Sequence, residues 1–406
     1  MPTPDINITT RSGGLGRRSP GTDMVSGLVM NVSAAYGVAA GSYVYTSLTQ
    51  AEAAGFSAAQ DTAENVLCHY HISEFFRVNP SGTLHVMLVA QGVTLTQMAD
   101  KSNQYAKKLL RDNNGSIKQI GLALNPATGY TPTITSGIDQ DSSAAVPVAQ
   151  ALAEEEESEH RPVYVLIEGR QITGSSASIL DARTLASENV SLVIGQDNVK
   201  ASQHALFYPH AALGTYLGVA SLANVHESTA WVSKFNIESV AESLFTSPGL
   251  SSRLPLTDYS TTDLDTLADK GFIFGVRHAG IAGVYPVGDA TCTAASGDFA
   301  QARYVRTMNK AKRVVRAELL PLLGAPLYVD SAGKLSANSI KNFEASASKA
   351  LRTLETAGEV SSFDVFVDPD QNVLSTDKVV VSIAIVPVGA ANTIEVSIGF
   401  DNPNSN

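Results

Sequence analysis

Hydrophobic residues in the last third of the chain follow two different periods. Apolar side chains recur at helical spacing across residues 298–320 and 337–357, which predicts two long helices. Pro321 follows the first helix and Gly358 follows the second, as is typical of helix ends. Apolar runs and alternation predict three strands after them, at residues 363–367, 379–385 and 393–398. Residues 271–390 are therefore predicted to form one α+β unit, completed by a strand from the chain end.

The preceding part of the chain alternates strand-like and helix-like segments. Short runs rich in Val, Leu and Ile predict strands, several of them buried on both faces: residues 25–32, 84–90, 117–124, 163–167 and 191–195. Helical segments of the length that parallel crossovers need lie between most of them. This pattern predicts a doubly wound, mostly parallel α/β domain.

Both ends of the chain carry short alternating strands. Their apolar positions are Ile6, Ile8, Ile394, Val396, Ile398 and Phe400. A strand of this kind can form a hairpin within its own chain or add to the sheet of a neighbour. We expect arms that pair with neighbours. The predicted organisation is an N-terminal arm (1–22), an α/β domain (23–240), a connecting segment (241–270), the C-terminal unit (271–390) and a C-terminal arm (391–406).

Composition and charge narrow the classes of protein. The chain has 406 residues, 44% hydrophobic and 17% charged, with a net charge of -11. An acidic chain of this kind argues against a general nucleic-acid binder, which needs a basic face. Cys68 and Cys292 lie too far apart in sequence to suggest a disulfide framework. With no signal-like start and no long apolar run, we expect synthesis in the cytoplasm and no membrane insertion.

One segment departs from this acidic balance. Residues 298–320 carry six basic side chains and two acidic ones. The intervals of three and four residues place four of the basic side chains on one helix face: Arg303, Arg306, Lys310 and Arg313. The face is either an ordinary solvated surface or a docking surface for an acidic partner protein. Nucleic acid is the weaker third alternative because of the overall charge.

Motifs of catalysis and metal binding do not assemble in the sequence. His69 and His71 are two residues apart and point in different directions on a helix. The segment from Asp368 begins like a calcium loop, but Val379 stands where the loop needs Glu, so a hairpin turn is expected. The Glu154–Glu157 run is expected to be a solvated helix face. We therefore expect no catalytic, cofactor or metal site. An oligomeric α/β hydrolase or transferase with swapped termini remains the alternative.

The C-terminal third resembles the C-terminal domain of contractile tail sheath proteins, found in contractile-tailed phages and related injection systems. The resemblance lies in the Arg-rich helix followed by Leu-Pro-Leu-Leu-Gly at 320–324, and in residues 358–372 and 379–398. The helix–strand step of residues 75–89 is similar to that of the sheath core. The chain departs from the family in having its single Trp at Trp231, which would make it a divergent, compact member.

The resemblance implies a mechanical function. Sheath subunits stack as helical rings around an inner tube, exchange terminal arms as added strands, and contract to drive the tube through an envelope. Their middle domain is subtilisin-like without catalysis, and no cofactor is needed. The implied partners are neighbouring subunits, the inner tube, and baseplate and terminator proteins, in a phage tail or phage-tail-like particle. The basic helix would face the tube. Another structural component of such a particle is a further alternative.

Overall fold

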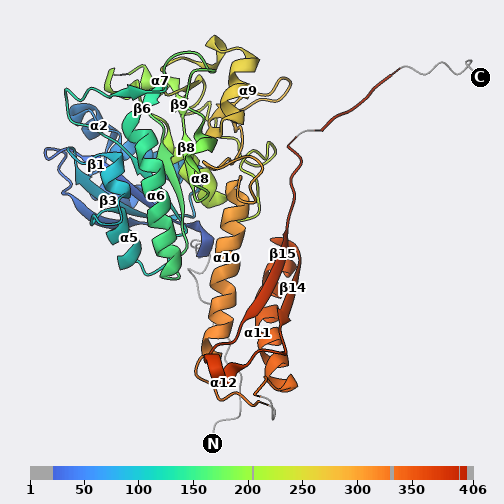
Figure 1. The fold of residues 1–406 in the computed structure, drawn as a ribbon. Helices are drawn as coiled ribbons and strands as arrows, with labels where there is room; N and C mark the ends of the chain where they lie inside the picture. Colours follow the sequence, from blue (N-terminus) through green and yellow to red (C-terminus); the bar gives the residue numbers. More distant parts are fainter. Residues whose placement is uncertain (1–21, 204, 330–332, 393, 400–406) are drawn as a thin grey trace, which may run out of the picture.

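The chain folds into an α/β domain and an elongated C-terminal unit that projects from one end of it (Figure 1). The structure, a computed structural model, describes residues 22–203, 205–329, 333–392 and 394–399. One long helix, α10 (Ala302–Leu319), begins in the domain and runs out into the unit (Figure 1). After β15 (Val381–Pro387) the described chain leaves the unit as an extended segment (Figure 1).

A seven-stranded sheet forms the centre of the α/β domain, in the order β11-β8-β7-β4-β1-β3-β2. Neighbouring strands run parallel except at the edge, where β2 is antiparallel to β3. The central strands are almost wholly buried, as their apolar runs predicted. The strands are β1 (Val25–Val32), β2 (Gly41–Tyr45), β3 (Thr83–Ala90), β4 (Gln119–Ala123), β7 (Tyr164–Glu168), β8 (Val190–Val193) and β11 (Phe272–Ile273).

Helices cover both faces of this sheet, which confirms the doubly wound architecture (Figure 1). On one face α3 (Cys68–Val78) packs against α8 (Leu213–Leu222). The two approach so closely that a Cβ at Gly214 would lie 2.2 Å from the carbonyl oxygen of His71, so only glycine fits. The other face carries α4 (Leu95–Ala99), α5 (Ala106–Asp112) and α6 (Gln140–Ser158).

Shorter elements complete the domain. The helices are α1 (Leu48–Ala53), α2 (Ala58–Glu64), α7 (Asn198–Ala201) and α9 (Thr261–Asp269). The strands are β5 (Ile134–Thr135), β6 (Ile138–Asp139), β9 (Gly195–Asp197), β10 (Pro248–Leu250), β12 (Gly275–Val276) and β13 (Tyr285–Pro286). Short 3₁₀ turns of the domain are η1 (Thr22–Met24), η2 (Ala182–Leu185), η3 (Ala205–Phe207) and η4 (Leu256–Asp258), and η5 (Leu320–Leu322) follows α10 in the C-terminal unit.

The boundary between the two parts differs from the predicted one at residue 271. Strand β11 pairs with β8 at the edge of the large sheet, and Phe272 and Phe274 are buried in the domain core. The segment 241–270, predicted to be a connection, supplies β10 and α9 to the same domain. The apolar run of residues 272–276 must be buried. Its position just before the basic helix in the sequence does not decide which sheet it joins. The C-terminal unit instead begins with α10.

The C-terminal unit is a helix pair that carries a two-stranded hairpin. Helix α11 (Ala337–Thr356) begins at Ser336, whose side chain accepts a hydrogen bond from the Ser339 amide. Strand β14 (Val360–Val367) pairs antiparallel with β15, and α12 (Val373–Thr376) lies in their connection. The unit has two small cores, one with the buried members Ala311, Leu351, Leu354 and Val360, the other with Leu335, Val367 and Val373. The third predicted strand, near residues 393–398, forms no ladder in the described residues.

Candidate functional site: helix α10 and the C-terminal hairpin

Two buried amide side chains, Asn31 and Asn125, lie at the point of the sheet where an α/β enzyme would bind its ligand, and a pocket of about 610 Å³ that includes Pro126 and Arg170 lies at the ends of β4 and β7. Such ligands lie at the carboxyl ends of parallel strands, where the strand order reverses. That point lies between β1 and β4 here. The buried Asn31 amide donates 2.8 Å hydrogen bonds to the carbonyl oxygens of Ala90 and Val93. The buried Asn125 amide donates to the Asn31 carbonyl and accepts from the Leu67 amide, both at 3.0 Å. Each of these side chains thus bonds to backbone groups, including those of the other asparagine.

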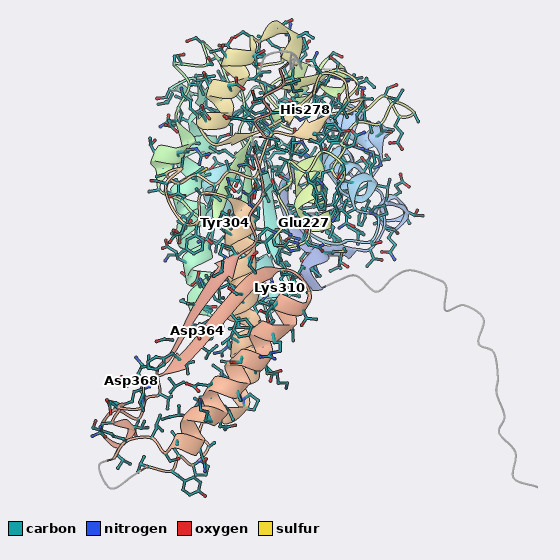
Figure 2. All side chains as sticks on the ribbon, turned by 90° about the vertical axis from the view of Figure 1, so that its right-hand side faces the viewer. Glu227, His278, Tyr304, Lys310, Asp364 and Asp368 are labelled. Atoms are coloured by element: carbon teal, nitrogen blue, oxygen red, sulfur yellow. The ribbon has the colours of Figure 1, made fainter. Side chains whose placement is uncertain are left out.

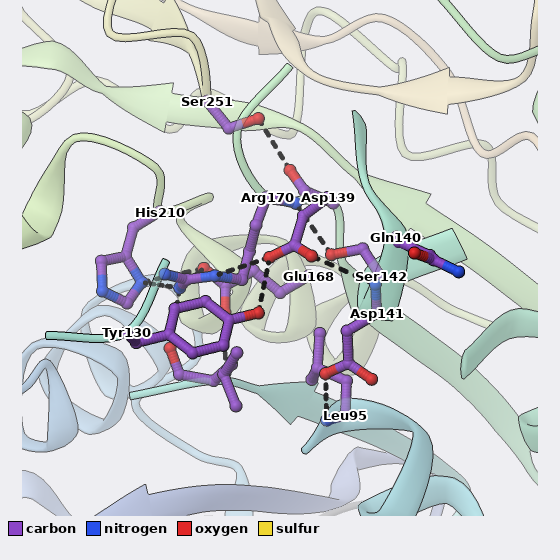
Figure 3. Close-up of polar contacts among 12 residues, drawn as sticks. Leu95, Tyr130, Asp139, Gln140, Asp141, Ser142, Glu168, Arg170, His210 and Ser251 are labelled. Atoms are coloured by element: carbon purple, nitrogen blue, oxygen red, sulfur yellow. Dashed lines mark hydrogen bonds and ion pairs between the residues drawn. The ribbon is translucent and has the colours of Figure 1, made fainter. Parts of the chain in front are cut away.

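A buried ion-pair cluster occupies the end of the next strand, β7 (Figure 3). Glu168 Oε1 lies 3.2 Å from Arg170 Nη1 and 2.8 Å from His210 Nδ1. Burial opposes ionisation of Glu168, but Arg170 and His210 outweigh it and hold its pKa at about 2. The carboxylate also accepts hydrogen bonds from the Leu124 and Ala211 amides. A carboxylate held this way is a poor proton acceptor near neutral pH, so the cluster serves structure.

The two histidines considered for metal binding lie in separate environments. His69 Nε2 is 3.3 Å from Glu52 Oε1, whereas His71 Nδ1 accepts a hydrogen bond from the Gly214 amide. Burial lowers the pKa of His71 to about 3, so its ring is neutral. Across the described residues, no group of three or more His, Cys, Asp or Glu side chains is arranged to hold a metal ion. In the same residues, no helix is long and apolar enough to cross a membrane.

The basic face predicted on α10 is buried at its N-terminal end. Arg303 is 2% exposed, and its Nη1 donates to Asp289 Oδ1 at 2.8 Å. Arg306 is 5% exposed, and its Nη2 donates to the Ala223 carbonyl at 2.8 Å. The expectation of a docking face is therefore wrong for these two residues. Spacing correctly predicts that they share a helix face, but this half of α10 packs into the α/β domain.

Farther along the same face, Lys310 and Arg313 join the two parts of the molecule. Figure 2 labels Lys310 near their junction. Lys310 Nζ lies 2.7 Å from Asp23 Oδ2 and 2.6 Å from Glu359 Oε1. Arg313 Nη2 lies 3.1 Å from Asp23 Oδ1. Asp23 precedes β1 of the domain, and Glu359 precedes β14 of the unit. The four predicted docking residues thus bind within their own chain, and docking of the tube on Lys310 and Arg313 stays a prediction.

The glutamate run of α6 is also less exposed than predicted. Glu156 is fully buried, and its carboxylate lies 2.8 Å from Lys107 Nζ and 2.7 Å from Arg161 Nε. Glu155 lies 2.7 Å from the same Lys107 Nζ. These pairs fasten α6 to α5 and to the segment that leads into β7. From the sequence alone, the run does not show which glutamate is buried or which cations pair with it.

An unfilled groove of about 570 Å³ lies between the C-terminal half of α10 and strand β15. Its apolar lining includes Met308, Ala311, Val315, Leu319, Ile383 and Ile385, and its basic lining Lys312, Arg313 and Arg316. The sequence does not predict this groove. Its only signal is the apolar periodicity of residues 298–320, which predicts a helix and does not say whether the apolar face is covered. Only a structure shows that part of this face is left uncovered.

The predicted arm residues lie away from any core where the structure describes them. Ile394, Val396 and Ile398 are 79%, 71% and 91% exposed. Ile6, Ile8 and Phe400 lie outside the described residues. Within one chain the described residues 394–399 add no strand to the hairpin, and the arm assignments stay predictions.

Comparisons with known structures show which fold this is. The chain is similar to the protein of the anti-feeding prophage helical sheath in its contracted state, at 14% identity and a TM-score of 0.63, over 99% of this chain and 100% of that one. A chain of the anti-feeding prophage baseplate matches at 14% identity and a TM-score of 0.60, over 99% of both chains. A chain of the PVC sheath complex, an extracellular contractile injection system in its contracted state, matches at 12% identity and 0.59, over 99% and 98%. Matches this distant in sequence show a shared fold.

Sequence comparisons give the family. No curated protein sequence matches the chain. Two family models match it: "DUF2586, N-terminal domain" over residues 3–290 and "DUF2586, C-terminal domain" over residues 298–405. The division between them falls just before α10, where the structure also changes from the α/β domain to the projecting unit. The chain therefore belongs to the DUF2586 family.

Proposed function

We propose that this chain is a structural subunit of a contractile sheath, which polymerises as stacked helical rings around an inner tube and contracts to drive the tube through an envelope. The observation that carries the proposal is the end-to-end match with a contracted sheath, over 99% of this chain and 100% of that one. An α/β domain alone hosts many functions. The more specific part of the match is the projecting unit, which follows the domain along the chain.

The interior of the α/β domain supports a role without catalysis. The side chains of Asn31 and Asn125 lie where the strand order reverses and bond to the backbone there. Arg170 and His210 keep Glu168 ionised. The domain would then be the subtilisin-like middle domain of such subunits, keeping the sheet without an active site. The alternative of a hydrolase or transferase has no comparable support in the described residues.

Terminal arms are proposed to hold the subunits together. The hairpin β14–β15 is two-stranded in the described residues, so each strand has one edge left to pair. Ile6 and Ile8 in one arm, and Ile394 to Phe400 in the other, would add strands to hairpins of neighbouring copies. Each backbone hydrogen bond contributes only about 1 kcal/mol, so several per strand and many subunits together would stabilise the lattice. Baseplate and terminator proteins would contact the ends of the sheath, and the inner tube its bore.

Electron microscopy of the purified full chain tests the sheath proposal. We expect long striated tubes or stacked rings that grow with protein concentration. A small, monodisperse oligomer that is unchanged at high concentration would contradict a sheath subunit.

Truncation tests the arms separately. Deleting residues 1–19 or residues 393–406 keeps every residue of the described cores, so we expect thermal unfolding within a few degrees of the full chain. Assembly should be lost in both variants. If either truncated protein still forms tubes, that arm is not needed, although the sheath proposal itself would stand.

A further inference from the structure

We propose that the pocket at the ends of β4 and β7 binds a small organic anion, one that joins a flat apolar ring to a carboxylate or a phosphate. The proposal adds a binding site to the α/β domain and concerns binding alone, without a reaction. It does not depend on the proposed sheath function, because the pocket lies within one chain.

The pocket lies where α/β folds hold their ligands. Its walls come from the loop after β4, the loop after β7 and the loop after β10. Strands β4 and β7 are parallel neighbours, so their carboxyl ends meet at one edge of the sheet. The volume of about 610 Å³ is typical of a small-molecule site. The pocket shares no lining residue with the groove beside α10.

Apolar and aromatic side chains make up much of the lining. Ile172 and Ile179 are buried, and the rings of Tyr130, Tyr208 and Tyr259 lie around the same space. Aliphatic carbon and tyrosine rings pack well against a flat apolar ring, which loses little conformational freedom when it binds. The lining therefore favours an aromatic body over a flexible polar one.

Arg253 gives the pocket its positive charge. Its guanidinium lies over the ring of Tyr208, with Cζ 4.0 Å from the ring centroid. A guanidinium stacked in this way keeps the N–H groups of its edge for other partners. Arg253 is exposed and has no ion-pair partner among the described residues. None of the described residues that line the pocket is an aspartate or a glutamate. A ligand oxyanion would therefore meet this cation without a competing carboxylate in the lining.

Arg170 adds an unpaired donor (Figure 3). Its Nη1 donates to the Leu124 carbonyl and lies 3.2 Å from Glu168 Oε1, so its charge is balanced inside the domain. Its buried Nε has no hydrogen-bond partner in the described residues, since Asp139 Oδ2 is 3.9 Å away. Buried donors are nearly always paired in native proteins. With Asp139 and Glu168 nearby, we place the oxyanion at Arg253 and only an uncharged ligand oxygen or a water at Arg170.

Two residues of the lining have an uncommon backbone conformation. Gln171 has a φ of 45° and Arg253 a φ of 71°, the left-handed region that favours glycine. Such conformations cost free energy and are concentrated at ligand sites. Their presence in two of the loops that form the pocket supports a binding role.

Isothermal titration calorimetry of the full-length chain tests the proposal with three matched probes. They are 2-naphthoate, 2-naphthyl phosphate and 2-naphthol, which share one ring system and differ in the charged group. We expect one site per chain for at least one of the two anions, and the stronger of them identifies the oxyanion. The uncharged 2-naphthol should bind at least about tenfold more weakly, because it offers no oxyanion to Arg253.

Variants locate the site. Arg253→Gln should weaken binding of the preferred anion by about tenfold and leave the affinity for 2-naphthol unchanged, because only the charge-assisted hydrogen bonds are lost. The matched control is Arg316→Gln, which removes an exposed arginine from the groove beside α10 and should leave all three affinities unchanged. Thermal unfolding midpoints within a few degrees of the parent chain show that both variants are folded.

Three results would overturn the proposal. Absence of binding by both anions would mean that the pocket holds only water. Equal affinities for 2-naphthol and the anions would make the site apolar and not anion-specific. Weaker anion binding in Arg316→Gln, with no change in Arg253→Gln, would move the probe to the groove. None of these results bears on tube formation by the same protein, so failure of this proposal is distinguishable from failure of the sheath function.

Discussion

At the scale of single residues, burial separates side chains that look alike in the sequence. Arg303 meets a carboxylate, whereas Arg306 donates to the carbonyl groups of Ala223, the C-cap of α8, and of Asn224 after it. A helix C-terminus carries partial negative charge, so a buried guanidinium is stabilised there without a carboxylate. Lys310 is shared between Asp23 and Glu359. Each cation on this face of α10 thus contributes to the junction of the two parts.

The Arg303–Asp289 pair should be important for stability. Asp289→Ala leaves the Arg303 charge buried without its carboxylate, which should lower the free energy of unfolding by about 3–5 kcal/mol. The control is Asp370→Ala, which breaks the exposed pair with Lys334 and should cost less than about 1 kcal/mol. Urea unfolding of the truncated, non-assembling chain measures both. Equal costs for the two variants would contradict the buried role of the pair.

His71 should make the fold sensitive to acid. Its pKa is about 3 in the folded chain and 6.5 in its ordinary state, so only the unfolded chain takes up this proton as the pH falls below 6.5. The free energy of unfolding should therefore decline by up to about 1.4 kcal/mol per pH unit from this residue between pH 6.5 and 3. His71→Asn keeps a hydrogen-bond acceptor for the Gly214 amide and removes the titration. Urea titrations at pH 7, 6 and 5 should show a shallower dependence in the variant, and an identical dependence would contradict this assignment.

At the scale of elements, α10 is the spine shared by both parts. Its N-terminal half is buried in the domain, and its C-terminal half packs with α11 and forms the wall of the groove. The hairpin beside it has a small core and a half-exposed inner face, with Phe363, Ile383 and Ile385 only partly covered. Such an element relies on a further layer for full burial.

Hydrogen exchange should show whether a further layer covers the hairpin after assembly. In the unassembled chain the amides of β15 that do not bond to β14 should exchange much faster than those of β1 and β4 in the centre of the large sheet. In tubes, the same β15 amides should slow by at least about tenfold, which corresponds to about 1.4 kcal/mol of added local stability. The central β1 and β4 amides serve as the internal control. Unchanged exchange at β15 after assembly would argue against an added strand.

At the scale of the whole molecule, a large and well-packed domain carries a small, incomplete unit. The domain has two extensive cores, one on each face of its sheet. The unit has two small ones and an unfilled groove. The ion pairs of Lys310 to Asp23 and Glu359 join the unit to the domain. The proposed sheath subunit would need both a well-packed domain and surfaces left free to pair with neighbours.

The sequence by itself determined the elements and their class. Apolar runs identified the buried strands β1, β3, β4 and β7, and helical spacing identified α10 and α11, because a local period fixes which side chains share a face. The motifs after α10 were enough to suggest the sheath family. The helices, the strands and these motifs depend only on residues that lie near one another along the chain.

The tertiary structure alone decided what covers each face. It placed Phe272 in the large sheet, buried Arg303 and Arg306 in the domain, turned Glu156 inward and left the groove beside Val315 uncovered. Spacing cannot supply these facts, because they depend on pairing between residues far apart in the chain. Burial and the partner of a charge are set by that long-range packing, whereas the periodicity of a helix or strand is not.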